Sequence, residues 1–333
     1  MTKIVLDANT LVAQHFLKGH LGIALVFASR RMGASIVIPE GTLKEAKFHT
    51  ARLAAERRRD IEAAADQLQV ILGGRPAVGW PGDQAIESAI ENHLEAIKDI
   101  VSLVPIDVDL ARAGLTRLIE RRPPSHNKEE FRDALLWETV LRLARDDRIY
   151  FVTEDFDFLV AKESKRALHP DLAAEIGRLG TPFEHHLTLS SLLDALGPDV
   201  KQPDRKAVSD TLADALLPMV QQELVSRGIT LQDVRESNWK VFATQDPNRL
   251  AVSFQTPFVA SSTSAASTSP VAATVIASGS AGLDPRTNQL MNVDLDGIEV
   301  SYEDGGRGGI KYMRASDSSS GSTWRTYEFR QPL

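Results

Sequence analysis

The chain has 333 residues, a length that suggests two domains. Hydrophobic residues make up 43% and charged residues 25%, and the absence of cysteine excludes disulfides, thiolate metal sites and cysteine nucleophiles. The net charge of −7 argues against a generally basic nucleic-acid-binding protein. It does not argue against carboxylates that collect around a metal ion, because such a site adds negative charge itself.

The hydropathy of the chain gives no sign of export or membrane insertion. No apolar run reaches the roughly 18 residues of a membrane span, so we expect none. Lys3 and Asp7 lie inside the stretch that a secretory signal would keep apolar, so we interpret these residues as the first strand of the fold. With no cysteine in the chain, we expect a cytoplasmic location.

Predicted strands and helices alternate up to residue 196. Short apolar runs predict strands at 3–6, 35–38, 101–106 and 148–152, and the proline inside 101–106 makes that strand short or an edge strand. Helical spacing predicts helices at 21–32, from 42 and through 50–72, at 83–100, 108–120, 131–146 and near 158–167, then a strand and a helix within 181–196. This alternation favours an α/β fold with a mostly parallel sheet.

The sequence changes in character after residue 197. Residues 205–227 are expected to be helical and 229–235 to begin another short helix. Beyond Trp239, short β-type runs alternate with Ser/Thr/Ala-rich and Gly-rich loops at 260–282 and 304–309. We therefore expect three regions: an α/β domain at 1–197, a helical linker at 198–237 and a small, mostly β accessory domain at 238–333.

Acidic residues follow the predicted strands or open the helices after them. Asp7 ends the first strand, Glu45 lies on the helix after the second, Asp133 opens a later helix, and Asp155 and Asp157 follow the strand at 148–152. Ligands of an open α/β sheet bind at the carboxyl ends of its strands, so these carboxylates are expected to meet there. Such oxygen ligands suit Mg²⁺ or Mn²⁺.

Each acid taken alone also has a structural interpretation. Asp7 fits turn chemistry, and Thr42 with Glu45 fits a capping box in which the glutamate closes a helix N-terminus. Asp133 could complement a helix dipole, and the acids after 148–152 could be turn residues. The occurrence of all of them at strand ends, in one chain, favours a site.

Four segments, in order, resemble the PIN-domain nucleases, and most closely a larger bacterial subgroup. These segments are KIVLDANTLV, IVIPEGTLKEAK, FRDALLWETVLRLA and YFVTEDFDF. The resemblance covers about residues 1–195 and implies a three-layer PIN-like fold with a helical insertion, because 87 residues separate Glu45 from Asp133. That insertion leaves the substrate specificity open more than the chemistry.

The resemblance also implies the site and its activity. Asp7, Glu45, Asp133 and Asp155 would be catalytic and would bind the metal with Asp157 as a fifth acid, while Asn9 and Thr153 would support them. Clustered carboxylates repel one another, so their pKa values are expected to be raised and metal binding to release protons. The implied activity is metal-dependent hydrolysis of phosphodiesters, with Mg²⁺ or Mn²⁺ as cofactor and RNA as the expected substrate.

Basic residues outside the acidic set are candidates for contacts with nucleic-acid phosphates, which would be independent of sequence. They are Arg57 and Arg58 on the long helix, and Arg121, Arg122, Lys128 and Arg132 in or beside the loop before Asp133. The alternative for Arg57 and Arg58 is a solvated helix face. We interpret His185 and His186 as surface or structural residues rather than a pair of ligands, and Asp294 and Asp296 as part of a loop between strands.

Other functions stay open at this stage. They are a DNA-directed nuclease of related fold, a non-catalytic nucleic-acid or protein-binding module, and a phosphatase with a nucleophilic aspartate. The last usually needs Asp-x-Asp, where this chain has Asp7-Ala8-Asn9. A toxin-like or defence role, a homodimer, and an inhibitor or regulatory protein partner are compatible with the sequence.

Overall fold

The computed structural model describes residues 1–333 except 75, 78, 127–129, 163–164, 198–199, 226–227, 263–270, 303–306, 312–325 and 328–333. Its contacts divide the chain into two compact units. Unit 1 comprises Met1–Val12 and Gly33–Thr188, and unit 2 comprises Ala13–Met32 and Leu189–Leu333. Each unit has its own sheet and its own core.

Unit 1 is built on a five-stranded parallel sheet in the order β3-β2-β1-β4-β7. Its inner strands are nearly continuous apolar runs, as expected of a parallel sheet covered on both faces. The α/β prediction is thereby confirmed, and the proline-limited strand does lie at an edge. The strands are β1 (Thr2–Leu6), β2 (Ser35–Pro39), β3 (Val101–Val104), β4 (Arg148–Val152) and β7 (Phe183–His186).

Helices connect these parallel strands, as crossovers require. One core cluster of unit 1 joins β1, β2 and β4 to the apolar side of α6 and is centred on Trp137, Phe151 and Phe158. The helical elements are α1 (Ala8–Ala13), α3 (Glu40–Leu72), α4 (Asp83–Ala96), α5 (Val108–Ile119), α6 (Phe131–Leu143), η1 (Phe156–Phe158) and α7 (Pro170–Gly177).

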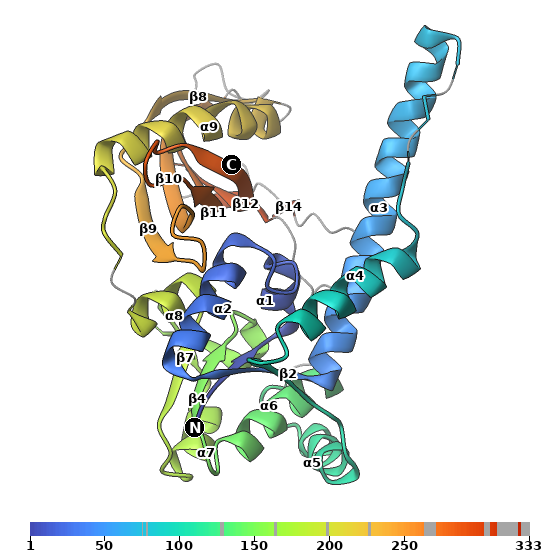
Figure 1. The fold of residues 1–333 in the computed structure, drawn as a ribbon, viewed down its shortest axis with the longest axis vertical. Helices are drawn as coiled ribbons and strands as arrows, with labels where there is room; N and C mark the ends of the chain where they lie inside the picture. The colour runs from blue at the N-terminus through green and yellow to red at the C-terminus, as the bar shows by residue number, and fades with distance from the viewer. Residues whose placement is uncertain are drawn as a thin grey trace. The chain divides into compact units, whose positions relative to one another are not determined.

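The predicted insertion between Glu45 and Asp133 forms a helical arm. α3 runs unbroken for 33 residues because it contains no proline and its one glycine, Gly41, lies in the first turn. The helix ends at Gly73, whose φ of 70° is a left-handed conformation that glycine adopts readily. Its far half extends away from α5 and α6, while α4 lies against its near half, where Lys47 pairs with Glu87 and Glu91 (Figure 1). Most side chains there are exposed, so this half contributes little to the core.

The segment expected to be a helix near 158–167 is a hairpin instead, so that prediction is wrong. β5 (Leu159–Lys162) pairs antiparallel with β6 (Lys165–Leu168). The residues have high helix propensity, but Leu159 is buried, and it packs with Leu168 in the core cluster of Trp137. Tertiary packing therefore overrides the local preference.

Unit 2 contains a seven-stranded antiparallel sheet. α9 lies across it and packs through residues spaced four apart: Val208, Leu212, Leu216, Val220 and Leu224 (Figure 1). The elements are α2 (His20–Met32), α8 (Leu189–Leu196), α9 (Arg205–Val225), β8 (Ile229–Val234), β9 (Asn238–Ala243), β10 (Leu250–Ser262), β11 (Val271–Leu283), β12 (Leu290–Tyr302), β13 (Arg307–Lys311) and β14 (Thr326–Tyr327).

Three predictions in this region are wrong. Residues 229–235 begin no helix, because β8 pairs with β10 and places Ile229 in the core. Asp294 and Asp296 lie within β12 rather than in a loop, and β11 likewise extends through 271–282. Long antiparallel strands thus replace several of the expected loops.

The division into units differs from the expected regions 1–197, 198–237 and 238–333. The residues expected to form a linker include α9, which belongs to the core of unit 2. α2 and α8 were both expected within the first region. In the structure α2 contacts β9, β10 and β11 of unit 2, and α8 contacts β9. None of the helices among the described residues is both long and apolar enough to cross a membrane.

Candidate active site

Asp7 follows β1 directly and is buried, with 4% of its surface exposed. Its Oδ1 accepts a hydrogen bond of 2.7 Å from the backbone N–H of Thr10, while Oδ2 is buried and has no hydrogen-bond partner. Burial raises the pKa of Asp7 to about 6, against hydrogen bonds from Thr10 and Thr153 that lower it. Asp7 is therefore a fixed carboxylate with one unsatisfied oxygen.

The end of β4 lies beside Asp7, because β1 and β4 are paired in parallel and the N–H of Asp7 donates to the carbonyl of Val152. The buried Thr153 comes next, and its Oγ1 accepts from the N–H of Asp155 at 3.1 Å. Oδ1 of Asp155 accepts in turn from the N–H of Asp157 at 2.9 Å. The negative charge of Asp155 helps to raise the pKa of Asp7, so the two acids share one environment.

Asp133 lies in the first turn of α6, as the sequence predicts. A helix dipole alone would favour its charged form. Burial instead raises the pKa of Asp133 well above its usual value, and the charges of Asp155, Glu45 and Asp157 raise it further. The dipole interpretation therefore does not describe its surroundings.

Glu45 lies in the second turn of α3, which begins at Glu40 after Pro39 with no side-chain cap. The alternative of a capping box formed by Thr42 and Glu45 is therefore wrong. The side chain of Glu45 is 14% exposed, and its Oε1 lies 2.8 Å from Nη1 of Arg132. Arg132 also reaches Glu130 with Nη2, at 3.4 Å.

The structure thus brings together acids from four separate segments. Asp133 feels the charges of Glu45, Asp155 and Asp157, and Asp155 connects this group to Asp7. Asn9 lies buried on α1, two residues after Asp7. The roles of these residues in metal binding and catalysis stay predictions.

The chemistry of these residues fits a divalent cation. They offer hard oxygen donors, Asp7 keeps a buried oxygen without a partner, and two carboxyls have pKa values that burial raises and neighbouring carboxylates raise further. Within the described part of the chain, however, no three acidic or histidine side chains form a ready set of metal ligands. The acidic side chains are close enough for their charges to act on one another, but they do not form a closed coordination shell.

His49 is a neighbour of this site that the sequence analysis did not identify. It lies one turn beyond Glu45 on α3, is 3% exposed, and places Nε2 3.6 Å from Glu45 Oε1. Neither ring nitrogen has a hydrogen-bond partner. The four-residue spacing from Glu45 was the available signal. His185 is structural as predicted, since its Nε2–H donates to the carbonyl of Thr153 at 2.9 Å.

Among the predicted phosphate contacts, Arg132 lies at the acidic residues. Arg57 and Arg58 lie along α3, twelve or more residues past Glu45 and so roughly 18 Å away along the helix, and pair with Asp60 and Glu62. Arg121 is exposed after α5, and Arg122 pairs with Glu120 and Glu175. Lys128 lies outside the described residues.

A family model described as PIN domain matches residues 4–158, a range that includes all five predicted acids. The comparison with curated proteins gives no match for the chain. The match indicates a metal-dependent nuclease and leaves the C-terminal region unassigned. The match, the parallel sheet and the acids at the carboxyl ends of its strands agree in making residues 4–158 similar to PIN domains.

Proposed function

We propose that the protein is a divalent-metal-dependent endoribonuclease whose metal-binding residues are Asp7, Glu45, Asp133, Asp155 and Asp157. The observation that carries this proposal is the buried Oδ2 of Asp7, which has no hydrogen-bond partner and lies at the carboxyl end of β1 beside the end of β4, in a segment that matches the PIN-domain family model. The pKa values of Asp7 and Asp133, raised by burial and further by the charge of Asp155, are consistent with it. A fold that gathers carboxylates it does not neutralise is suited to a cation.

Each residue of the site would have a distinct part. Hydrogen bonds from Thr10 and Thr153 fix the Asp7 carboxylate and leave Oδ2 free to bind the metal. The turn between Thr153 and Asp157 fixes the direction of Asp155. A bound Mg²⁺ or Mn²⁺ supplies an activated water and offsets charge on the phosphate. Asn9 would support Asp7 from α1.

The choice of RNA is supported by the PIN-domain resemblance, and the position of Arg132 supports a phosphate-bearing substrate. Arg132 brings a positive charge to the entrance of an otherwise acidic site, where its side chain is 41% exposed. A guanidinium in this position can contact a phosphate while it faces Glu45. We propose a cytoplasmic location and a toxin-like or defence role. We also expect a homodimer, which light scattering tests, and a regulatory protein partner, which co-purification tests.

The test is cleavage of single-stranded RNA, structured RNA and single-stranded DNA by the full chain with Mn²⁺, Mg²⁺ or EDTA. Asp7→Asn and Asp155→Asn are compared with Asp210→Asn, which removes a 62% exposed carboxylate on α9 of unit 2. We expect metal-dependent cleavage of RNA that both site variants lose and the control keeps. Cleavage that survives in both site variants would disprove the site, and cleavage of DNA alone would disprove the substrate.

A further inference from the structure

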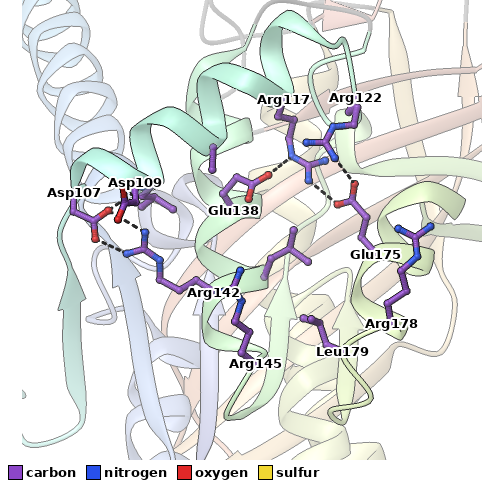
Figure 2. A pocket seen from close by; sticks show the side chains of 13 residues that line it. Asp107, Asp109, Arg117, Arg122, Glu138, Arg142, Arg145, Glu175, Arg178 and Leu179 are labelled. Carbon is purple, nitrogen blue, oxygen red and sulfur yellow. Dashed lines mark hydrogen bonds and ion pairs between the residues drawn. The ribbon is translucent and has the colours of Figure 1, made fainter.

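Unit 1 carries a second concave feature, a pocket of about 700 Å³ between α5, α6 and α7 (Figure 2). None of the five predicted acids lines it. α6 connects the two places: Asp133 lies in its first turn and Arg142 in its last, nine residues or roughly 13 Å further along the helix. The volume lies in the range of pockets that bind small organic ligands.

One wall of the pocket is fixed by ion pairs around a buried arginine. Arg117, 1% exposed, places Nε 2.7 Å from Glu138 and Nη2 2.6 Å from Glu175, and its Nη1 donates to the carbonyl of Pro123. Trp137 donates a further hydrogen bond to Glu175 at 2.8 Å. These carboxylates are therefore neutralised within the wall, and an anionic ligand would not meet their full charge.

An ion pair between an arginine and an aspartate also fixes the opposite side of the pocket. Arg142 on α6 forms two hydrogen bonds of 2.5 and 2.9 Å with Asp107, the residue that caps α5 (Figure 2). The Arg142 guanidinium holds the pKa of Asp107 well below its usual range, so this aspartate remains ionised and paired. Asp109 also lines the pocket, 3.9 Å from Arg112.

Two further arginines in the lining, Arg145 and Arg178, have no such partner. No hydrogen bond or ion pair joins either of them to another of the thirteen lining residues (Figure 2). Leu110, Leu141 and Leu179 add apolar surface between the charged groups. The pocket therefore combines two exposed guanidinium groups, which none of its other lining residues pairs, with apolar surface.

We propose that this pocket binds a nucleotide unit, with Arg145 or Arg178 contacting its phosphate and the leucines contacting its sugar or base. Guanidinium groups recognise phosphate oxygens through paired N–H donors, and apolar side chains bury the rest of such a ligand. The nucleotide is either free or part of a nucleic-acid strand, and the chemistry of recognition is the same for both. Binding here requires no metal and no cleavage.

Calorimetric titration of the full chain in EDTA tests this site. The probes are adenosine 5′-monophosphate, adenosine, inorganic phosphate and a 5′-phosphorylated single-stranded tetranucleotide. We expect a phosphorylated nucleoside or oligonucleotide to bind, and adenosine to bind at least about tenfold more weakly, because a charge-assisted contact is lost. Binding of the tetranucleotide without the monophosphate would identify a strand as the source, and binding of both would identify a free nucleotide as sufficient.

Arg145→Ser with Arg178→Ser should weaken this binding by about tenfold or more, whereas the control Arg286→Ser should not change it. Arg286 is a 71% exposed arginine of unit 2 outside the pocket, and Arg145 and Arg178 are also exposed, so both variants should fold. The proposal is wrong if no phosphorylated nucleoside or strand binds, if inorganic phosphate binds as well as they do, or if the double variant binds like the control. Asp7→Asn should bind normally, which separates this result from a failure of the nuclease proposal.

Discussion

Arg132 Nη1 lies 2.8 Å from Glu45 Oε1 and so joins the head of α6 to the second turn of α3. The same guanidinium approaches Glu130 at 3.4 Å. A cation that binds to Glu45 must therefore compete with a positive charge already on that carboxylate. Arg132 balances part of the negative charge of the site, and because its side chain is 41% exposed it is also accessible to a phosphate.

We predict that Arg132→Gln tightens metal binding and weakens RNA binding. Removing one positive charge near the carboxylates should favour Mn²⁺ by about 1 kcal/mol, or roughly a fivefold lower Kd, if the local dielectric is high. The KM for RNA should rise because a phosphate contact is lost. Calorimetry with Mn²⁺ and steady-state kinetics measure the two effects, with Arg112→Gln as control. An unchanged Kd for Mn²⁺ with a higher KM would reduce Arg132 to a phosphate contact alone.

Stability should depend on pH through Asp7. Its folded pKa of about 6 is raised from 3.8, so the folded state prefers the protonated form. This contribution to stability is fully present below pH 3.8 and is lost as the pH rises through about 6, and the total loss is about 3 kcal/mol. Without metal, Asp7→Asn should therefore be more stable than the wild type near neutral pH.

Urea unfolding in EDTA at about pH 5 and about pH 7.5, followed by hydrogen exchange in β1 and β4, measures this difference within unit 1. The gain from Asp7→Asn should be larger at the higher pH. The exposed Asp210→Asn should show no such dependence. A variant that is less stable than the wild type at the higher pH would mean that Asp7 is well solvated or paired.

Metal binding should release protons near pH 6. Burial and the neighbouring charges raise the pKa of both Asp7 and Asp133, so both carboxyls hold protons that a cation must displace. Titration with Mn²⁺ in buffers of different ionisation enthalpy gives the number released. We expect a release that falls as the pH rises, and a smaller release in Asp7→Asn. Equal enthalpies in all buffers at about pH 6 would contradict the raised pKa values.

The ends of β1 and β4 could be predicted from the sequence because both strands are continuous apolar runs. Asp7 follows the first and Asp155 the second. Asp7 and Asp155 lie where that pattern places them. Glu45 had a local alternative, a capping box, that only the true helix start at Glu40 excludes. The ion pair between Glu45 and Arg132 joins residues 87 apart and leaves no local signal.

Tertiary pairing explains what was mispredicted. Residues 159–168 favour a helix by propensity, yet they pair as β5 and β6, with Leu159 and Leu168 in the core cluster of Trp137. The association of α2 with the sheet of unit 2 depends on contacts to strands more than two hundred residues later, such as His20 Nε2–H donating to the carbonyl of Asn292 at 2.6 Å. No local pattern around His20 indicates such a partner.

Finally, the buried Arg117 should be essential for the stability of unit 1. Arg117→Met leaves Glu138 and Glu175 facing each other without their shared cation, and breaking a buried pair in this way costs about 3–5 kcal/mol. The control Arg112→Met removes an exposed arginine from the same helix and should change stability by no more than about 0.5 kcal/mol. Hydrogen exchange in α5 and α6 across a urea series measures both. Adding Glu138→Leu and Glu175→Gln to Arg117→Met should restore much of the loss, because no stranded carboxylate then remains, Arg122 keeps Glu120, and the amide oxygen can still accept from Trp137. If the triple variant is no more stable than Arg117→Met alone, the loss arises from the packing of Arg117 and not from the stranded carboxylates.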